Sequence, residues 1–242
     1  MRNDIAIQLY SLRDISANDY MAALRHVANV GFQNVELAGS YGLSGEELKA
    51  VLDELGLKAI SSHVPFSADP AYIKEQMAFN RAVGNNTIVC PHSNTGNLEE
   101  TMQSVKNLKI WQEELEKEGF IFGYHNHAHE MKKVDGDKRA IDILAEEGIK
   151  LQPDVFWVKT GGYDPVEFIN RYSGQIVSLH FKEYSADGKN VEFGTGILPW
   201  QEIMEAGKRA GAAYNILEQE QYTMDVADSI ALCAQNLDRM FQ

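Results

Sequence analysis

Apolar and polar positions follow one recurring pattern along this chain: an amphipathic helical segment, a glycine, and a short β-rich run that ends in polar residues. The pattern predicts eight strands, at Ile5–Tyr10, Asn34–Ala38, Lys58–His63, Thr87–His92, Phe120–Asn126, Lys150–Phe156, Gln175–Phe181 and Ala213–Gln219. A glycine just past a helix supplies the left-handed residue that ends the helix. Such glycines precede every strand except the first, at Gly31, Gly56, Gly84, Gly119, Gly148, Gly174 and Gly211.

Helix-start signals fill the intervals between these strands. Ser44 followed by Glu47 matches a capping box, and Asn97 opens a longer helix. Asp164-Pro165 places a proline in a first helical turn. The last helix is predicted over 224–240, with one apolar face made by Val226, Ile230, Cys233 and Leu237.

Strands that alternate with helices imply a parallel sheet of the α/β class. The sheet either closes into a (β/α)₈ TIM barrel or stays open as a doubly wound sheet. Eight regular units, without a GxGxxG phosphate-binding motif after the first strand, favour the barrel. No linker, low-complexity segment or second domain interrupts the pattern, so we expect residues 1–242 to form a single barrel domain.

Composition is typical of a soluble globular protein, with 44% hydrophobic and 24% charged residues. The two cysteines, Cys90 and Cys233, lie in apolar stretches and are expected to be buried free thiols. No stretch approaches 18 consecutive apolar residues, so no membrane span is expected. Residues 1–4 lead directly into the first strand without a signal-peptide pattern, and a cytoplasmic location is the expectation.

The net charge is -13, from 22 Lys+Arg and 35 Asp+Glu, and no Lys/Arg-rich run is present. Such a chain repels a phosphate backbone, so nucleic acid is not an expected partner.

Candidate chemistry lies at the ends of the predicted strands, where a (β/α)₈ barrel builds its active site. Polar side chains stand there at Glu36, His63, His92, His125, Asn126, His127, Asp154, His180 and Glu218. Charged residues in strand interiors are costly unless they are paired or bind a metal. A lone histidine such as His63 or His92 is more often a hydrogen-bonded barrel residue than a ligand, but the combined set is hard to explain as packing and indicates a functional site.

Asp154, His180 and Glu218 occupy corresponding ends of strands six, seven and eight. Two carboxylates and an imidazole predict a site for one divalent metal ion, Mn²⁺, Mg²⁺, Co²⁺ or Zn²⁺. A fourth ligand is expected from the end of strand five. Glu130 is preferred because a carboxylate completes an oxygen-rich set, and the alternatives are His125, Asn126 or His127.

Motifs from one end of the chain to the other carry a family resemblance. They are Ile7–Ser11, Gly31–Leu37, Tyr124–Glu130, Leu151–Trp157, Gly161–Pro165, Leu179–Glu183, Gly194–Gly196 and Leu217–Gln219. With them the chain resembles the xylose isomerase-like TIM barrel superfamily, in the sugar phosphate isomerase/epimerase branch. In that branch a Glu, Asp, His, Glu set from strands five to eight holds a divalent ion. The resemblance therefore implies Glu130, Asp154, His180 and Glu218 as ligands.

Four positions depart from the branch pattern. Pro153 stands where relatives usually have an apolar residue, and Glu183 replaces an aspartate. Thr195 takes a place commonly held by glutamate, and Pro199 one held by aspartate or asparagine. None removes a proposed ligand, but Thr195 cannot make the loop contact of that glutamate.

The metal set and the resemblance imply a metal-dependent isomerase or epimerase for a sugar, sugar phosphate or keto-sugar. It would remove a proton α to a carbonyl and pass through an enediolate. The expected catalytic residues are Glu130, Glu218, His127 and Lys182, and the expected substrate-binding residues are Glu36, His63, His92, His125 and Trp157. Lys182 is equally well explained by an ion pair with Glu36, Asp154 or Glu218.

Other functions remain as alternatives. A lyase or dehydratase would use the same enolate on inositol ketones or 3-keto-glycosides. A phosphodiesterase with a multi-zinc site is disfavoured by the negative charge, and a non-catalytic sugar-binding barrel would bind no metal. The expected partner is a small polyhydroxylated substrate, and barrels of this kind often form homo-oligomers.

Overall fold

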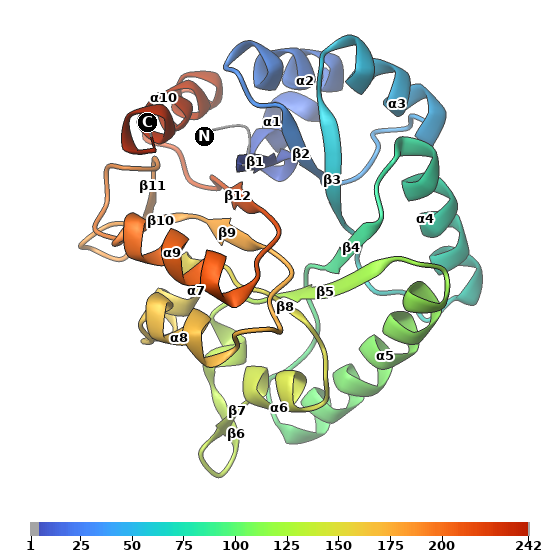
Figure 1. The fold of residues 1–242 in the computed structure, drawn as a ribbon, viewed down its shortest axis with the longest axis vertical. Helices are drawn as coiled ribbons and strands as arrows, with labels where there is room; N and C mark the ends of the chain where they lie inside the picture. Colours follow the sequence, from blue (N-terminus) through green and yellow to red (C-terminus); the bar gives the residue numbers. More distant parts are fainter. Residues whose placement is uncertain (1–4, 242) are drawn as a thin grey trace.

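A computed structural model describes residues 5–241 (Figure 1). Residues 1–4, where no signal-peptide pattern is expected, lie outside this range. The main sheet consists of β1 (Ile5–Gln8), β2 (Asn34–Leu37), β3 (Lys58–His63), β4 (Thr87–Cys90), β5 (Ile121–His125), β8 (Leu151–Gln152), β9 (Leu179–Phe181) and β12 (Asn215–Leu217). Two hairpins are made by β6 (Lys133–Asp135) with β7 (Lys138–Arg139), and by β10 (Glu183–Tyr184) with β11 (Asn190–Val191).

Helices connect and cover these strands. They are α1 (Arg13–Ser16), α2 (Tyr20–Asn29), α3 (Gly45–Glu54), α4 (Pro70–Val83), α5 (Leu98–Lys117), α6 (Ala140–Glu146), α7 (Val155–Thr160), α8 (Pro165–Arg171), α9 (Trp200–Ala210) and α10 (Val226–Met240). Two 3₁₀ turns, η2 (Leu9–Leu12) and η3 (His129–Met131), follow β1 and β5. No helix within residues 5–241 is long and apolar enough to cross a membrane.

The eight strands run parallel in the order β8-β5-β4-β3-β2-β1-β12-β9. Between β8 and β9 the sheet is joined by isolated bridges, Leu151 with Ile176 and Asp154 with His180. The His180 N–H donates to the Pro153 carbonyl at 2.8 Å. The strands therefore form a nearly closed barrel, and the predicted (β/α)₈ TIM barrel of the α/β class is confirmed.

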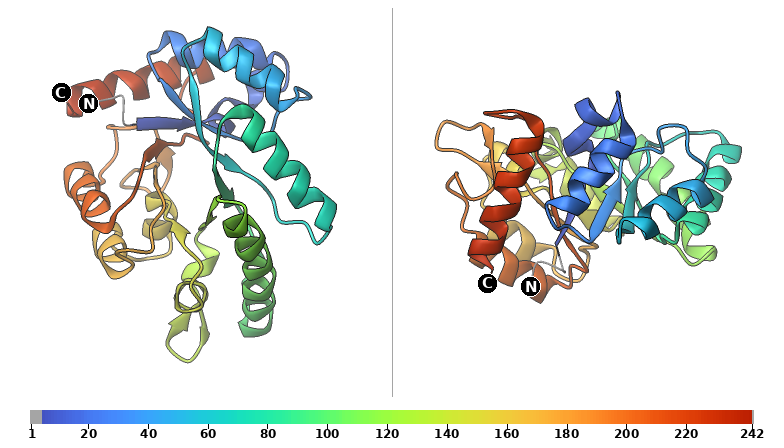
Figure 2. Two further views of the ribbon diagram at one scale, coloured as in Figure 1. Left: turned by 45° about the vertical axis from the view of Figure 1, so that its right-hand side comes forward. Right: turned by 90° about the horizontal axis from the view of Figure 1, so that it is seen from above.

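The helices form a ring around the strands (Figures 1 and 2). Its two ends meet where α10 lies beside α2, and His26 Nε2 of α2 is 3.0 Å from the Ala227 carbonyl oxygen. The hairpin of β6 and β7 projects from the ring below α6 in Figure 1. The helices surround the barrel on its outside, so the ends of the strands and the loops that follow them are available to form a site.

Local signals in the sequence produce the expected helix ends. Ser44 and Glu47 form a reciprocal capping box at α3, and Asn97 and Asp164 cap α5 and α8. The seven glycines that precede strands have φ between 68° and 92°, the left-handed region in which only glycine is unstrained. The last helix begins at Val226, two residues later than predicted, because the Asp225 side chain caps it.

Strand six is shorter than its sequence predicts. The predicted strand Lys150–Phe156 is wrong beyond Gln152, because β8 ends there and α7 begins at Val155. Pro153 has no N–H to continue the ladder. The Asp154 side chain then accepts the Trp157 N–H at 3.0 Å and caps α7. Pro153, one of the departures from the family pattern, is therefore where the strand changes into a helix.

Both cysteines are buried and unpaired, as expected. Burial raises the pKa of Cys90 to about 11 and that of Cys233 to about 12. Both are therefore protonated thiols at neutral pH, and they act as small apolar core residues.

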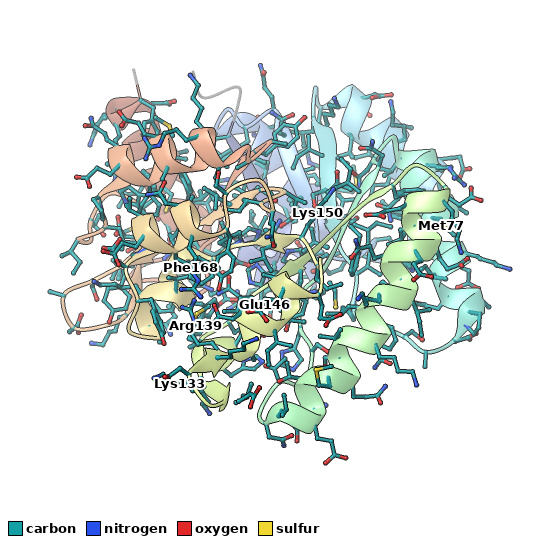
Figure 3. All side chains as sticks on the ribbon, turned by 60° about the horizontal axis from the view of Figure 1, so that its bottom comes forward. Met77, Lys133, Arg139, Glu146, Lys150 and Phe168 are labelled. Atoms are coloured by element: carbon teal, nitrogen blue, oxygen red, sulfur yellow. The ribbon has the colours of Figure 1, made fainter. Side chains whose placement is uncertain are left out.

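Arg139, labelled in Figure 3, forms a buried ion pair with Asp142 of α6, and Tyr172, which follows α8, joins it. Arg139 Nε and Nη2 donate to the two Asp142 carboxylate oxygens at 2.8 and 2.9 Å. The Tyr172 hydroxyl donates to the same carboxylate at 2.6 Å, and the Arg139 guanidinium lies 5.6 Å from the centre of the Phe168 ring. Burial would raise the pKa of Asp142, but the hydrogen bonds from Arg139 and Tyr172 hold it below its ordinary value.

We predict that Asp142→Asn lowers the free energy of unfolding by about 2 kcal/mol at neutral pH, since hydrogen bonds to charged groups are lost. The folded-state pKa of Asp142 is lowered, so this stabilisation is complete above the unfolded-state pKa of about 3.9. It disappears as the pH falls below that value. Urea denaturation at several pH values measures the difference from the wild-type protein.

Asp137→Asn is the matched control, because Asp137 pairs with Lys133 on the exposed β6–β7 hairpin. Its free energy of unfolding should stay close to that of the wild-type protein. Equal losses in the two variants would contradict a special role for the buried pair.

Candidate metal centre and active site

Six of the seven histidines gather at the carboxyl ends of the strands. Their rings form a continuous series of contacts, with centroid separations of 5.2 Å (His180–His63), 5.0 Å (His63–His125), 5.1 Å (His125–His127), 5.9 Å (His127–His92) and 5.1 Å (His92–His129). The seventh, His26, lies on α2. The strand ends thus bring together residues that are far apart in the sequence.

Four buried residues, which we call the centre, converge inside this series. They are His125 at the end of β5, Asp154 at the start of α7, His180 of β9 and Glu218 after β12. One nitrogen or carboxylate oxygen from each lies within 4.8 Å of those of the other three. The structure therefore brings Asp154, His180 and Glu218 together, as the sequence predicts.

The centre has the chemistry of a divalent-metal site. One Asp154 oxygen accepts the Trp157 N–H, but the buried Oδ2 has no hydrogen-bond partner. Its closest charged partner is Lys182, whose Nζ is 3.8 Å away. A buried carboxylate oxygen without a hydrogen bond is rare unless an ion or water completes it. Two carboxylates with two imidazoles suit Mn²⁺, Co²⁺ or Zn²⁺, so these residues fit such an ion.

Glu36 accepts a hydrogen bond from His180 and so orients its ring. Glu36 Oε1 lies 2.7 Å from His180 Nε2, and His180 Nδ1 lies 3.2 Å from Glu218 Oε2. Since a carboxylate only accepts, both nitrogens donate here, and an ion bound at Nδ1 would replace the proton of that nitrogen. Burial would lower the pKa of His180, but Glu36 and Glu218 raise it to about 10. Carboxylates that hold a histidine in this way are typical supports of metal ligands.

Gln152 connects the histidines to Glu36. Its Oε1 lies 2.7 Å from His63 Nε2 and 3.2 Å from His125 Nδ1. Its amide donates to Glu36 Oε2 at 2.7 Å and to Ser178 Oγ at 2.9 Å. Sequence reasoning missed this residue, although a glutamine inside the predicted strand six, two residues before Asp154, was a usable signal.

Lys182 forms ion pairs rather than facing the pocket. Its fully buried ammonium lies 3.4 Å from Glu218 and 2.5 Å from Glu220. It also lies 4.8 Å from the centre of the Trp157 ring. Burial would raise the pKa of Glu218, but Lys182 and His180 hold it well below its ordinary value, so this carboxylate is ionised. Glu220, another residue that the sequence analysis missed, shares the same cation.

Glu130, the preferred strand-five ligand, lies outside the centre. Its Oε1 accepts the Tyr124 hydroxyl at 2.5 Å and lies 3.0 Å from His129 Nε2. Its Oε2 accepts the His127 N–H at 2.8 Å. Both oxygens are therefore used to fix the turn after β5, and His125 is the strand-five residue that reaches the centre.

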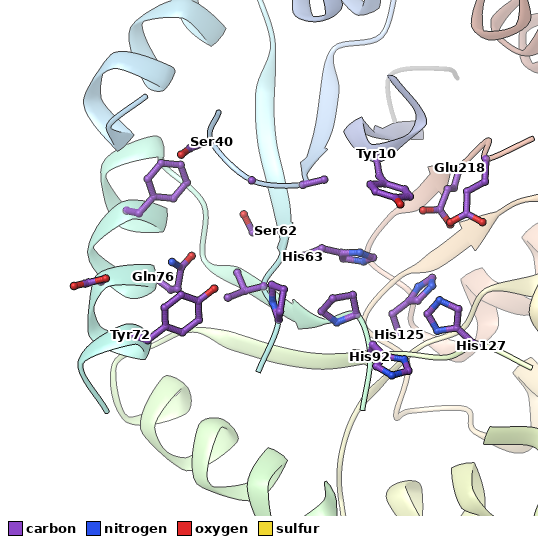
Figure 4. Close-up of a pocket in the computed structure, with 18 residues that line it drawn as sticks. Tyr10, Ser40, Ser62, His63, Tyr72, Gln76, His92, His125, His127 and Glu218 are labelled. Atoms are coloured by element: carbon purple, nitrogen blue, oxygen red, sulfur yellow. The ribbon is translucent and has the colours of Figure 1, made fainter. Parts of the chain in front are cut away.

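A pocket of about 690 Å³ opens beside the centre (Figure 4). Among the expected site residues, its walls include His63, His92, His125, His127 and Glu218. Glu36, Glu130, Asp154, Trp157, His180 and Lys182 do not line it. The pocket runs from the histidines to the side of α4, where Tyr72 and Gln76 stand (Figure 4). Glu36 and Trp157, which were expected to bind substrate, are therefore not among the residues that line the pocket.

Comparisons with known proteins agree with this architecture. The family model described as Xylose isomerase-like TIM barrel matches residues 24–239, and the chain belongs to this family. No curated protein sequence matches the chain. A solved sugar phosphate isomerase/epimerase from Parabacteroides distasonis is 24% identical, with a TM-score of 0.84 and coverage of 97% of both chains.

Two other solved structures share the fold at lower identity. An L-ribulose 3-epimerase is 17% identical with a TM-score of 0.72, and the match covers 98% of this chain and 92% of that one. The probable 3-DHS dehydratase AsbF from Bacillus anthracis is 13% identical with a TM-score of 0.72, and the match covers 99% of both chains. At these identities the similarity shows the fold.

Replacement of Glu36 tests its support of His180. Glu36→Gln removes the anion that accepts the His180 N–H, and we expect divalent-metal affinity to fall by about 10- to 100-fold. Competition with a chromophoric chelator measures the affinity.

Glu192→Gln is the control, because Glu192 is also a buried carboxylate but accepts hydrogen bonds from Thr223 and Ser229, which are not part of the centre. Its metal affinity should equal that of the wild-type protein. Unchanged affinity in Glu36→Gln would show that His180 needs no such support.

Proposed function

We propose that this protein is a divalent-metal-dependent isomerase or epimerase of a sugar or keto-sugar, with His125, Asp154, His180 and Glu218 as metal ligands. The observation that carries the proposal is the position of Glu218. This carboxylate belongs to the centre and also lines the pocket, so it can meet a substrate there. Membership of the xylose isomerase-like family and the shared fold with a solved L-ribulose 3-epimerase support the same class of reaction.

A bound divalent ion would polarise a substrate carbonyl and stabilise negative charge on its oxygen. The ionised Glu218 would remove the proton from the carbon next to that carbonyl, and the electron pair would move to give an enediolate. Return of the proton to the neighbouring carbon gives isomerisation, and return to the opposite face gives epimerisation. Lys182, which pairs with Glu218, would hold the carboxylate in place.

The pocket walls fit a polyhydroxylated substrate. His63 and Tyr10 both line the pocket, and an imidazole and a phenol can each donate and accept hydrogen bonds with hydroxyl groups. His63 is itself held by Gln152 and Glu36, at 2.7 and 3.1 Å. We propose His63 as the residue that binds a hydroxyl next to the reacting carbon.

Proton exchange tests this function. Metal-loaded protein incubated with a panel of keto-sugars in D₂O should exchange the proton α to the carbonyl, as followed by NMR. Glu218→Gln removes a proposed metal ligand as well as the proposed base, so it should slow the exchange by about 100-fold or more, 100-fold being the smallest usual contribution of a general base. Glu192→Gln should exchange at the wild-type rate. Absence of exchange over the whole panel would overturn the proposal.

The extent of the pocket favours a second candidate, a lyase acting on a keto-glycoside through the same proton abstraction. The pocket continues past the centre to Tyr72, Gln76 and Phe79 of α4, which leaves room for a second ring. In this reaction the electron pair left by the proton expels a β-substituent, and a pocket histidine such as His63 would protonate it. Release of an aglycone with enone absorbance identifies the lyase, whereas exchange without release identifies the isomerase or epimerase.

A further inference from the structure

Three histidines outside the centre form a second cluster of nitrogen atoms. His92 follows β4, and His127 and His129 follow β5. One ring nitrogen from each lies within 4.8 Å of those of the other two. His92 is exposed and the other two are half-buried, so solvent reaches the cluster. None of these residues belongs to the centre.

The two segments that carry the cluster are tied together before any ligand binds. The Ser93 N–H donates to the Tyr124 hydroxyl at 3.1 Å, and that hydroxyl donates to Glu130. Glu130 in turn accepts the His127 N–H. This series of hydrogen bonds joins the β4 and β5 loops, so the three imidazoles are held near one another by the fold.

Two of the rings each have one nitrogen, Nδ1, that is not hydrogen-bonded to the protein. His129 Nε2 lies 3.2 Å from the Ser93 carbonyl oxygen and 3.0 Å from Glu130 Oε1, both of which only accept. His129 Nε2 therefore carries a proton, and Nδ1 is the nitrogen left to bind an ion. His127 Nδ1 is buried without a hydrogen-bond partner. A buried polar nitrogen of this kind calls for a partner that the protein itself does not supply.

The ligand type of the cluster determines which metal ions it can bind. Three imidazoles without a carboxylate suit Zn²⁺, Cu²⁺ or Ni²⁺, whereas Mg²⁺ and Ca²⁺ require oxygen ligands. Tetrahedral zinc with bonds of about 2.0–2.1 Å places its nitrogen ligands about 3.3 Å apart. Because His92 is exposed, a small rotation of its side chain can bring the nitrogens from within 4.8 Å to that separation.

We propose that His92, His127 and His129 form a second metal site that binds a zinc-class ion. Since His92 and His127 line the pocket, the open fourth position of the ion faces the substrate. The ion would bind an oxygen of the substrate there. Glu130 is a positioning residue of this site, because it fixes His129 through Nε2 and His127 through its backbone.

Zinc binding to the full chain tests the second site. Metal-free protein is saturated with Zn²⁺, desalted and assayed by elemental analysis, with Zn²⁺ itself as the probe. Wild-type protein should hold two equivalents, and His92→Ala and His129→Ala one each. Asp154→Asn, which removes a proposed ligand of the centre, should keep the equivalent that His92→Ala loses. His26→Ala, a histidine on α2 that bonds to the Ala227 carbonyl, should hold two.

Two outcomes separate this inference from the proposed function. If His92→Ala holds as much zinc as the wild-type protein, the second site is overturned. If His92→Ala loses one equivalent and Asp154→Asn loses none, the second site stands and the proposed centre fails. His92 is exposed, so its removal should leave the melting temperature of the metal-free protein unchanged, and circular dichroism confirms that the variant is folded.

Discussion

Buried charge at the carboxyl end of the barrel is the constraint on which the other features of the site depend. Glu36, Asp154 and Glu218 are almost completely removed from solvent, together with the ammonium of Lys182. Moving such groups out of water costs several kcal/mol per ion unless partners compensate them. Hydrogen bonds satisfy Glu36, whereas Asp154 keeps an oxygen without one. The centre therefore combines carboxylates that have hydrogen-bond partners with one buried carboxylate oxygen, Asp154 Oδ2, that has none.

The break in strand six positions Asp154 at the centre. β8 ends at Gln152, and Asp154 then makes a single bridge to His180 and caps α7 with its side chain. Pro153 ends the ladder, and its carbonyl accepts the His180 N–H. This bond and the bridge between Asp154 and His180 close the barrel at the point where the centre lies. The same two contacts therefore close the barrel and bring Asp154 and His180 of the centre together.

Much of this arrangement could be predicted from the sequence, because barrel geometry places strand ends together. Asp154, His180 and Glu218 each end a recognisable strand, so their convergence follows from the fold. The strand-five residue could not be chosen in this way, since Tyr124–Glu130 offers several donors and only the turn after β5 decides which one points inward. That turn uses Glu130 for its own hydrogen bonds and leaves His125 at the centre.

Other features depend on contacts that a sequence pattern does not contain. The role of Gln152 arises from distances to His63 and His125, which lie in other strands. The extension of the pocket to α4 brings Tyr72 and Gln76 of that helix together with His63 of β3 and His125 of β5. Glu36 and Trp157 do not line the pocket as predicted. Glu36 of β2 is hydrogen-bonded to His180, and Trp157 of α7 packs against His127.

A crystal structure of the Mn²⁺-loaded protein, with the ion located by its anomalous scattering, tests the assignment of the four metal ligands. We expect an ion bonded to His125, Asp154, His180 and Glu218, with Glu130 still hydrogen-bonded to Tyr124. An ion bonded to Glu130 in place of His125, or no ion between Asp154 and Glu218, would contradict it.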